Sequence, residues 1–257
     1  MKRKLVACLA SSSVLLLLSS VYLLRRFYEA EYLKRANSAA APAKRVFPDN
    51  RWVDLHALHV QRSDKKDLKG GYLFLGDSIT FQFGIQGAAA FEKHFGSRHS
   101  AFFGIGGDCT QHLLWRIQNG ELACCTDAGA SPKAIVLNIG TNNIGINTAD
   151  EIAEGISAVV TAIDGIAAPS AALIITLIFP RGQHPNPFRD AIAAVNTKVR
   201  SHFAADVLRR RVFFIDLGPQ LLEQDGMTIS TALLPDFIHL SSEAYERWCR
   251  AVVDIEL

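Results

Sequence analysis

Five short apolar runs lie between residues 72 and 217 of the chain. They lack the alternation of apolar and polar positions that a half-exposed strand shows, so each predicts a strand buried on both faces of a parallel sheet. The runs are YLFLGD (72–77), AFFG (101–104), AIVLNIG (134–140), ALIITLIF (172–179) and RVFFIDL (211–217). Neighbouring parallel strands need long crossover connections, and the segments between the runs are long enough to supply them as helices.

Helical periodicity and capping residues mark two of these segments. Thr148 and Glu151 form a capping box, which predicts that a helix begins there. Asn186 followed by Pro187 supplies a cap and a first-turn proline for a second helix. The predicted inner faces are Ile152, Ile156, Val159, Val160 and Ile163 in the first helix, and Phe188, Ile192, Val195, Val199 and Phe203 in the second.

The last helix is predicted to follow Ser241 or Ser242. Five strands alternating with helices predict an α/β fold, a three-layer α/β/α sandwich around a doubly wound, five-stranded parallel sheet. In such sheets ligands bind outside the carboxyl ends of the strands, so the loops that follow the apolar runs are the places to look for chemistry.

Twenty consecutive residues near the N-terminus, 5–24, carry no charge. As a helix they would span roughly 30 Å, about one hydrocarbon core. We therefore expect residues 1–26 to be an N-terminal signal anchor in a membrane, with its side left open because basic residues flank both ends. The alternative is a cleaved signal peptide and secretion, although the nearest A-x-A pattern, at positions 41–43, lies well beyond the run.

Residues 27–47 are charged and then rich in Ala, Ser and Pro, which predicts a linker, and the folded domain is expected to span 48–257. A chain of 257 residues is long enough for one sizeable α/β domain. Apart from the five basic residues of positions 1–26, the chain has 22 basic against 25 acidic residues. This balance lacks the excess of basic residues that a protein needs to bind the phosphates of a nucleic acid.

The five cysteines, Cys8, Cys109, Cys124, Cys125 and Cys249, include no C-x-x-C pair. Neither a metal site nor a disulfide framework is therefore predicted, and the redox state of the adjacent pair stays open. FGIGGD does not meet the dinucleotide pattern G-x-G-x-x-G, and the chain has no P-loop. We expect no cofactor.

Ser78 follows the first apolar run in the sequence FLGDSITFQF. At a turn from strand to helix, its hydroxyl and its backbone N–H can both face the crevice at the sheet edge, which makes Ser78 a candidate nucleophile. The alternative is that Ser78 only caps the following helix, which is the usual role of a serine after a strand. Gly76 allows the turn to be tight.

His239 and Asp236, in the loop LLPDFIHL, can approach one point. An aspartate on the ring nitrogen remote from the serine fixes the histidine tautomer, and the histidine then acts as the base. The alternative is an exposed loop histidine beside a capping aspartate. His112, in TQHLLWR, is a rival base, but its helical surroundings indicate packing instead.

Donors for an oxyanion are expected at the ends of the second and third runs. Asn142, in IGTNN, offers a side-chain amide, and FFGIGGD offers glycine N–H groups. Together with the N–H of Ser78 they can make a three-donor oxyanion hole. Asn and Gly are also the commonest turn residues, so ordinary turns are the alternative.

Four blocks of the sequence together resemble one family. GDSIT, FGIGGDCTQHLLWRIQNGEL, GTNN and DFIHL are similar, in this order, to the four blocks of the SGNH, or GDSL-type, hydrolases. FPRGQHPNPFRDAIAAVN is similar to a further stretch typical of one subgroup, which contains the catalytic subunits of intracellular platelet-activating factor acetylhydrolase and their bacterial relatives. The resemblance runs from about residue 50 to the C-terminus.

The resemblance implies a flavodoxin-like fold, an SGNH hydrolase catalytic domain over 48–257, and no metal. It implies that Ser78 is the nucleophile, His239 the base and Asp236 its partner. It also implies that the N–H groups of Ser78 and Gly107, with the amide of Asn142, form the oxyanion hole. The expected activity is that of a serine esterase that cleaves a small acyl group, often acetyl, from a lipid ester or related substrate.

The sequence departs from the family in three places. GTNN stands where the superfamily more generally has G-x-N-D, an insertion-like segment LACCTDAGASPK precedes the third run, and the soluble subunits lack a counterpart of the predicted anchor. The alternatives are therefore an acetylated carbohydrate as substrate, or a membrane-tethered module that binds without turnover. A homodimer is a further expectation.

Overall fold

The computed structural model describes residues 39–45, 49–65, 68–127, 129, 131–208 and 212–257. These residues belong to one compact unit, Ser38–Leu257. Its strands are β1 (Tyr72–Gly76), β2 (Ala101–Gly104), β3 (Ala134–Asn138), β4 (Ala172–Thr176) and β5 (Val212–Ile215). Each of the five apolar runs contains one of these strands, so the strand predictions are confirmed.

The strands form one parallel sheet in the order β2-β1-β3-β4-β5. The chain passes from β1 to β2 on one side and then places β3 on the other side of β1, so the strand order reverses there. Gly76 at the end of β1 is level with Gly104 at the end of β2 and with Asn138 at the end of β3. The loops after these three strands therefore start at one edge of the sheet, where doubly wound proteins bind their ligands.

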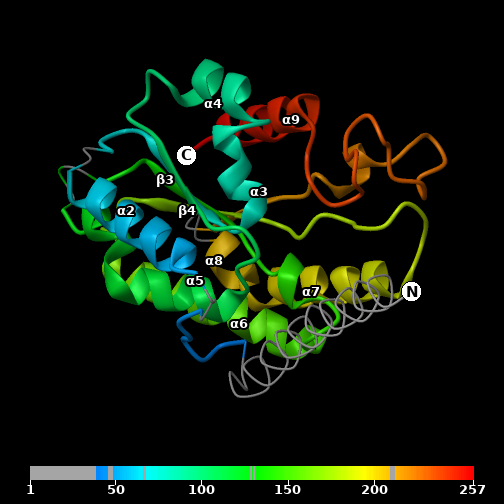
Figure 1. The fold of residues 1–257 in the computed structure, drawn as a ribbon, viewed down its shortest axis with the longest axis horizontal. Coiled ribbons are helices and arrows are strands. Elements are labelled where there is room, and N and C mark those ends of the chain that lie inside the picture. Colours follow the sequence, from blue (N-terminus) through cyan, green and yellow to red (C-terminus); the bar gives the residue numbers. More distant parts are fainter. Residues whose placement is uncertain (1–38, 46–48, 66–67, 128, 130, 209–211) are drawn as a thin grey trace, which may run out of the picture. The chain divides into compact units, whose positions relative to one another are not determined.

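Helices cover both faces of the sheet (Figure 1). Leu73 and Leu75 of β1 face the layer with α5 (Thr110–Arg116), α6 (Ala149–Ile166) and α7 (Pro187–His202). Tyr72 and Phe74 face the opposite layer with α3 (Ser78–Phe81), α4 (Ala88–Phe95) and α9 (Ser242–Val253). Among the described residues, the other α-helices are α2 (Arg51–Lys65), before β1, and α8 (Ala204–Leu208), before β5. The predicted three-layer α/β/α sandwich is confirmed.

The predicted starts of three helices are confirmed. Thr148 and Glu151 form the capping box of α6, Asn186 caps α7, and Ser241 caps α9. In each case a side-chain oxygen accepts a hydrogen bond from an N–H group that the first helical turn leaves without a partner.

One residue of the predicted inner face of α7 was assigned wrongly. Phe188 is 46% exposed, whereas the other four predicted residues are buried. Phe188 is the second residue of the helix, and its ring packs on the guanidinium of Arg181, 5.1 Å from the ring centre. The first turn of α7 therefore carries a surface aromatic side chain at this position.

The predicted anchor at 5–24 lies outside the described residues, as does most of the predicted linker. Among the residues that are described, no helix is long and apolar enough to cross a membrane. The described part of the linker, 39–45, packs on the domain. Ala39 is fully buried, its carbonyl accepts a hydrogen bond from the hydroxyl of Thr110 at 2.8 Å, and the N–H of Ala43 donates to the carbonyl of Gln111 at 3.0 Å.

Candidate active site

Ser78 is the first residue of α3, two residues after the end of β1. The N-cap of this helix is Asp77, whose carboxylate accepts a hydrogen bond from the N–H of Ile79 at 2.9 Å. Because Asp77 does the capping, the hydroxyl of Ser78 is left for another partner. That partner is His239, whose Nε2 lies 3.0 Å from Ser78 Oγ.

Asp236 holds the other side of the His239 ring. Its Oδ2 lies 2.6 Å from Nδ1, and its Oδ1 accepts hydrogen bonds from the N–H groups of Ile238 and His239, at 3.1 and 2.7 Å. Desolvation raises the pKa of Asp236, but the hydrogen bonds from His239 and Ile238 outweigh it and lower the pKa. An ionised carboxylate can only accept, so Nδ1 carries the ring proton and donates to Asp236. Nε2 then accepts a hydrogen bond from the hydroxyl of Ser78.

The backbone between Asp236 and His239 is bent to make this arrangement. Phe237 has a φ of +61°, a left-handed conformation that few residues other than glycine adopt. The carbonyl of Phe237 accepts a hydrogen bond from the N–H of Gly182 at 3.1 Å, which ties this loop to the loop after β4. Such conformations persist where surrounding contacts hold them, and they are frequent at active sites.

The loop after β2 lies against the Ser78 turn. A Cβ on Gly104 would collide with the backbone nitrogen of Phe81, so only glycine allows this approach. A Cβ on Gly106 would lie 3.8 Å from the Cβ of Ser78, in ordinary contact. The glycine block predicted from the sequence therefore lies directly beside the candidate nucleophile.

Gly107 is the third residue of a turn that the N–H of Asp108 closes by donating to the carbonyl of Ile105, at 3.2 Å. Its φ of +79° is the left-handed value that a type II turn requires at this position. No described residue accepts a hydrogen bond from the N–H of Gly107. This donor is therefore not engaged by the described part of the chain.

Asn142 lies in the single turn Thr141–Asn143 after β3. Its amide nitrogen donates to the backbone carbonyl of Asp108 at 2.9 Å and lies 3.4 Å from Asp77 Oδ2. The contact with Asp77 is longer than an ordinary hydrogen bond. The amide N–H that makes it can therefore donate to a stronger acceptor instead. Asn142 thus links the Ser78 turn to the glycine loop, and the structure brings all three predicted strand-end loops together.

Asp77 is a buried acid beneath this group of residues. Desolvation raises its pKa to about 7, the N–H of Ile79 works against the rise, and the nearby charge of Asp108 adds to it. Its protonation state therefore changes near neutral pH, next to the turn that carries Ser78.

Arg116 is a buried residue behind the site whose role the sequence analysis missed. Its guanidinium donates to the carbonyl of Gly76 at 3.0 Å and to that of Phe103 at 2.8 Å. It also binds Asp108 Oδ2 at 2.8 Å and both oxygens of Glu121, at 2.8 and 2.7 Å. One side chain of α5 therefore fixes the ends of β1 and β2 and the glycine loop at the same time.

Glu121 completes this network. Its Oε1 lies 3.0 Å from Nδ1 of His56 and 3.1 Å from Nδ1 of His59, both in α2. Desolvation raises its pKa, but Arg116 and the two histidines lower it well below the usual range.

Within the described part of the chain, no group of His, Cys, Asp and Glu side chains could hold a metal ion.

His112, the rival base, is buried in α5. Its Nδ1 accepts a hydrogen bond from the N–H of Cys109 at 3.0 Å. Burial lowers its pKa to about 3, with smaller contributions from Arg45 and Arg116. His112 therefore acts as a neutral packing residue at the start of α5, as its helical surroundings indicated.

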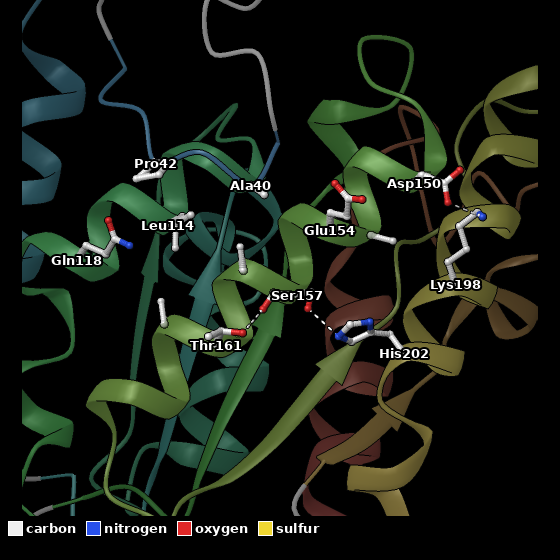
Figure 2. A pocket seen from close by; sticks show the side chains of 13 residues that line it. Ala40, Pro42, Leu114, Gln118, Asp150, Glu154, Ser157, Thr161, Lys198 and His202 are labelled. Carbon is white, nitrogen blue, oxygen red and sulfur yellow. Dashed lines mark hydrogen bonds and ion pairs between the residues drawn. The ribbon is translucent and has the colours of Figure 1, made fainter.

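A surface cavity of about 640 Å³ lies elsewhere, lined by residues of α5, α6, α7 and the 39–45 segment (Figure 2). Ser157 of α6 and His202 of α7 lie 2.8 Å apart there, and Lys198 pairs with Asp150 at 2.6 Å. None of the candidate residues at the strand ends lines this cavity. The Ser157–His202 pair belongs to the helix surface and not to the sheet edge.

Comparisons with known proteins identify the family of the chain. The sequence profile of the GDSL-like Lipase/Acylhydrolase family matches residues 74–247. The platelet-activating factor acetylhydrolase IB subunit alpha1 of Bos taurus is 38% identical over 215 residues, which cover 84% of this chain and 86% of the relative.

Solved structures share the fold. A protein from Streptococcus pneumonia, described as a platelet activating factor, superposes with a TM-score of 0.63 at 18% identity, over 92% of this chain and 97% of its own. An acetylxylan esterase from Geobacillus stearothermophilus superposes with a TM-score of 0.55 at 16% identity, over 72% of this chain and 94% of its own. At these identities the likeness concerns the fold alone. The profile match and the identity to the acetylhydrolase subunit show that the chain is a carboxylic ester hydrolase and belongs to the GDSL-like lipase/acylhydrolase family.

Proposed function

We propose that the protein is a serine esterase with Ser78 as nucleophile, His239 as base and Asp236 as the carboxylate that orients the base. The observation that carries the proposal is the unbroken chain of contacts from Asp236 through His239 to Ser78, at 2.6 and 3.0 Å. The ionised Asp236 stabilises the imidazolium that forms when His239 takes the serine proton.

The reaction proceeds by acyl transfer in two stages. Ser78 Oγ attacks the ester carbonyl carbon while its proton moves to His239 Nε2. His239 then protonates the leaving alcohol, and the acyl group stays on Ser78. A water that is deprotonated by His239 releases the acid and restores the free serine.

Three donors stabilise the tetrahedral oxyanion in this proposal: the N–H of Ser78, the N–H of Gly107 and the amide of Asn142. The proposal is supported by the position of Ser78 at the first turn of α3, where N–H groups have no partner within the helix. It is also supported by the absence of a described acceptor for Gly107 and by the long contact of Asn142 with Asp77, 3.4 Å. Removing one such donor lowers turnover by about 10²–10³ in other hydrolases.

We propose an acetyl ester of a lipid alcohol as the substrate. The support is the name of the relative, a platelet-activating factor acetylhydrolase subunit that aligns with 84% of the chain. An acetylated carbohydrate is the second candidate, supported by the acetylxylan esterase among the similar structures. Measuring hydrolysis of an acetyl-alkyl-phospholipid beside that of acetyl-xylan separates the two.

Hydrolysis of p-nitrophenyl acetate tests the esterase proposal. We expect the full chain to hydrolyse it and Ser78→Ala to lose the activity. Ser157→Ala is the matched control, because Ser157 also contacts a histidine, at 2.8 Å, but lies outside the site. Equal rates for wild type and Ser78→Ala would remove the assigned nucleophile. An inactive wild type would favour a module that binds without turnover.

We also propose that residues 5–24 tether the domain to a membrane, on the strength of their uncharged run. Alkaline carbonate extraction is expected to leave the full chain in the membrane pellet. Recovery in the supernatant with a processed N-terminus would mean a cleaved signal peptide. Sedimentation of the detergent-solubilised protein tests the expected homodimer.

A further inference from the structure

Arg45 belongs to the predicted linker, but its side chain reaches the glycine loop of the candidate site. Its Nη1 donates to the carbonyl of Gly106 at 2.8 Å and lies 3.6 Å from Asp108 Oδ1. Only 21% of the side chain is exposed. A Cβ on Gly107 would stand 2.7 and 2.8 Å from the two terminal nitrogens, so the guanidinium covers this glycine.

The ion pair with Asp108 does not explain this position. The carboxylate of Asp108 already accepts hydrogen bonds from Trp52 Nε1 at 2.7 Å and from Arg116 at 2.8 Å. Oδ1 of Asp108 lies 3.6 Å from Arg45 Nη1, which is longer than a hydrogen bond. The contact of Arg45 with the backbone carbonyl of Gly106, at 2.8 Å, is shorter than its contact with Asp108, at 3.6 Å.

The carbonyl of Gly106 and the N–H of Gly107 belong to one planar trans peptide group and point in opposite directions. This group is the central peptide of the turn that begins at Ile105, and its orientation distinguishes type I from type II turns. Because both residues are glycines, no side chain excludes the reversed orientation. A charged donor on the carbonyl favours the orientation in which Gly106 O faces Arg45 and the Gly107 N–H faces away from it.

We propose that Arg45 is a positioning residue that fixes the Gly106–Gly107 peptide and strengthens the Gly107 N–H as an oxyanion donor. A hydrogen bond from a charged donor is stronger than a neutral one, and bonding at the carbonyl polarises the peptide so that its N–H donates better. The gain is largest when the substrate carbonyl becomes an oxyanion, so Arg45 acts on the transition state more than on substrate binding. The inference rests on the proposed function, because it takes Gly107 as an oxyanion donor.

The test compares Arg45→Met, which removes the charged donor, with Arg45→Lys, which keeps one. In the full chain with p-nitrophenyl acetate, Arg45→Met is expected to lower kcat roughly 10-fold with KM within about twofold, as the loss of a hydrogen bond from a charged group predicts. Affinity for a trifluoromethyl ketone, which forms a tetrahedral adduct, is expected to fall by a similar factor. Arg45→Lys is expected to recover most of the lost kcat.

Lys44→Met is the matched control, because Lys44 carries the same charge on the same segment but lies over the ring of Trp115, 5.8 Å from its centre. Its kcat is expected to equal that of wild type. A wild-type kcat in Arg45→Met, or a loss confined to KM, overturns the inference. An equal loss of kcat in Arg45→Lys and Arg45→Met, with a lower unfolding midpoint in both, overturns it as well.

The failure of this inference can be told from failure of the proposed function. If Ser78→Ala keeps activity, the nucleophile itself is misassigned and the role of Arg45 falls with it. If Ser78→Ala and Asn142→Ala are impaired while Arg45→Met is not, the esterase mechanism stands and the positioning role alone is lost.

Discussion

Replacing Arg116 with methionine removes the buried cation that joins α5 to the ends of β1 and β2. The variant loses hydrogen bonds to the carbonyls of Gly76 and Phe103 and to the carboxylates of Asp108 and Glu121. Methionine fills a similar volume, so the main cost is the loss of charge compensation and not a cavity. Both carboxylates stay buried without their strongest partner.

The expected loss of unfolding free energy is about 3–5 kcal/mol, the usual cost of removing one partner from a buried ion pair. Two carboxylates do not double this figure, because each keeps other partners. Asp108 keeps Trp52, and Glu121 keeps the rings of His56 and His59. A domain stable by about 10 kcal/mol, the middle of the usual range, remains folded after such a loss.

Urea unfolding of the full chain, followed by tryptophan fluorescence, measures this change. Trp52 is a local reporter, because its ring nitrogen donates to Asp108 at 2.7 Å. The double variant Arg116→Met, Glu121→Gln is expected to recover part of the loss, because one uncompensated carboxylate is gone. A loss below about 1 kcal/mol, or no recovery in the double variant, would refute the electrostatic reasoning.

Three further predictions concern the site itself. Asn142→Ala is expected to lower kcat about 10²–10³-fold; a change confined to KM would contradict its oxyanion role. Asp236→Asn is expected to lower kcat by about 10⁴, because an amide no longer fixes the tautomer of His239; near-wild-type turnover would show that the carboxylate is dispensable. The pKa of Asp77 is raised from 3.8 to about 7, so between pH 5 and 7 the folded protein keeps a proton that the unfolded chain has released. The unfolding free energy therefore falls as the pH rises through this range. The wild-type unfolding free energy is expected to fall by about 2 kcal/mol relative to Asp77→Asn across that range, and parallel urea midpoints would contradict the assigned pKa.

The strands and the strand-end loops were predictable because their signals are local. The apolar run 134–140 forms a strand that is buried at every position. The capping box of Thr148 and Glu151 involves only residues of the first helical turn. The approach of His239 to Ser78, 161 residues away in sequence, was predicted from the family resemblance, because the loop that holds His239 does not directly follow a predicted strand.

What the sequence did not reveal depends on contacts between distant segments. Asp77 and not Ser78 caps α3, a choice between two neighbouring capping residues that local pattern does not make. Arg116 lies in a stretch whose charges look like those of an exposed helix face, and its burial depends on Glu121 and two strand ends. Arg45 lies in a segment with the composition of a linker, although its hydrogen bond to Gly106 spans 61 residues.

Covalent labelling of the serine tests the central claim most directly. The full chain is treated with a fluorophosphonate, digested, and the modified residue is located by mass spectrometry. The account predicts a single phosphonylated serine, Ser78, with labelling greatly slowed in His239→Ala. Labelling at Ser157 or another serine, or unlabelled Ser78 in a chain that still hydrolyses p-nitrophenyl acetate, would contradict it.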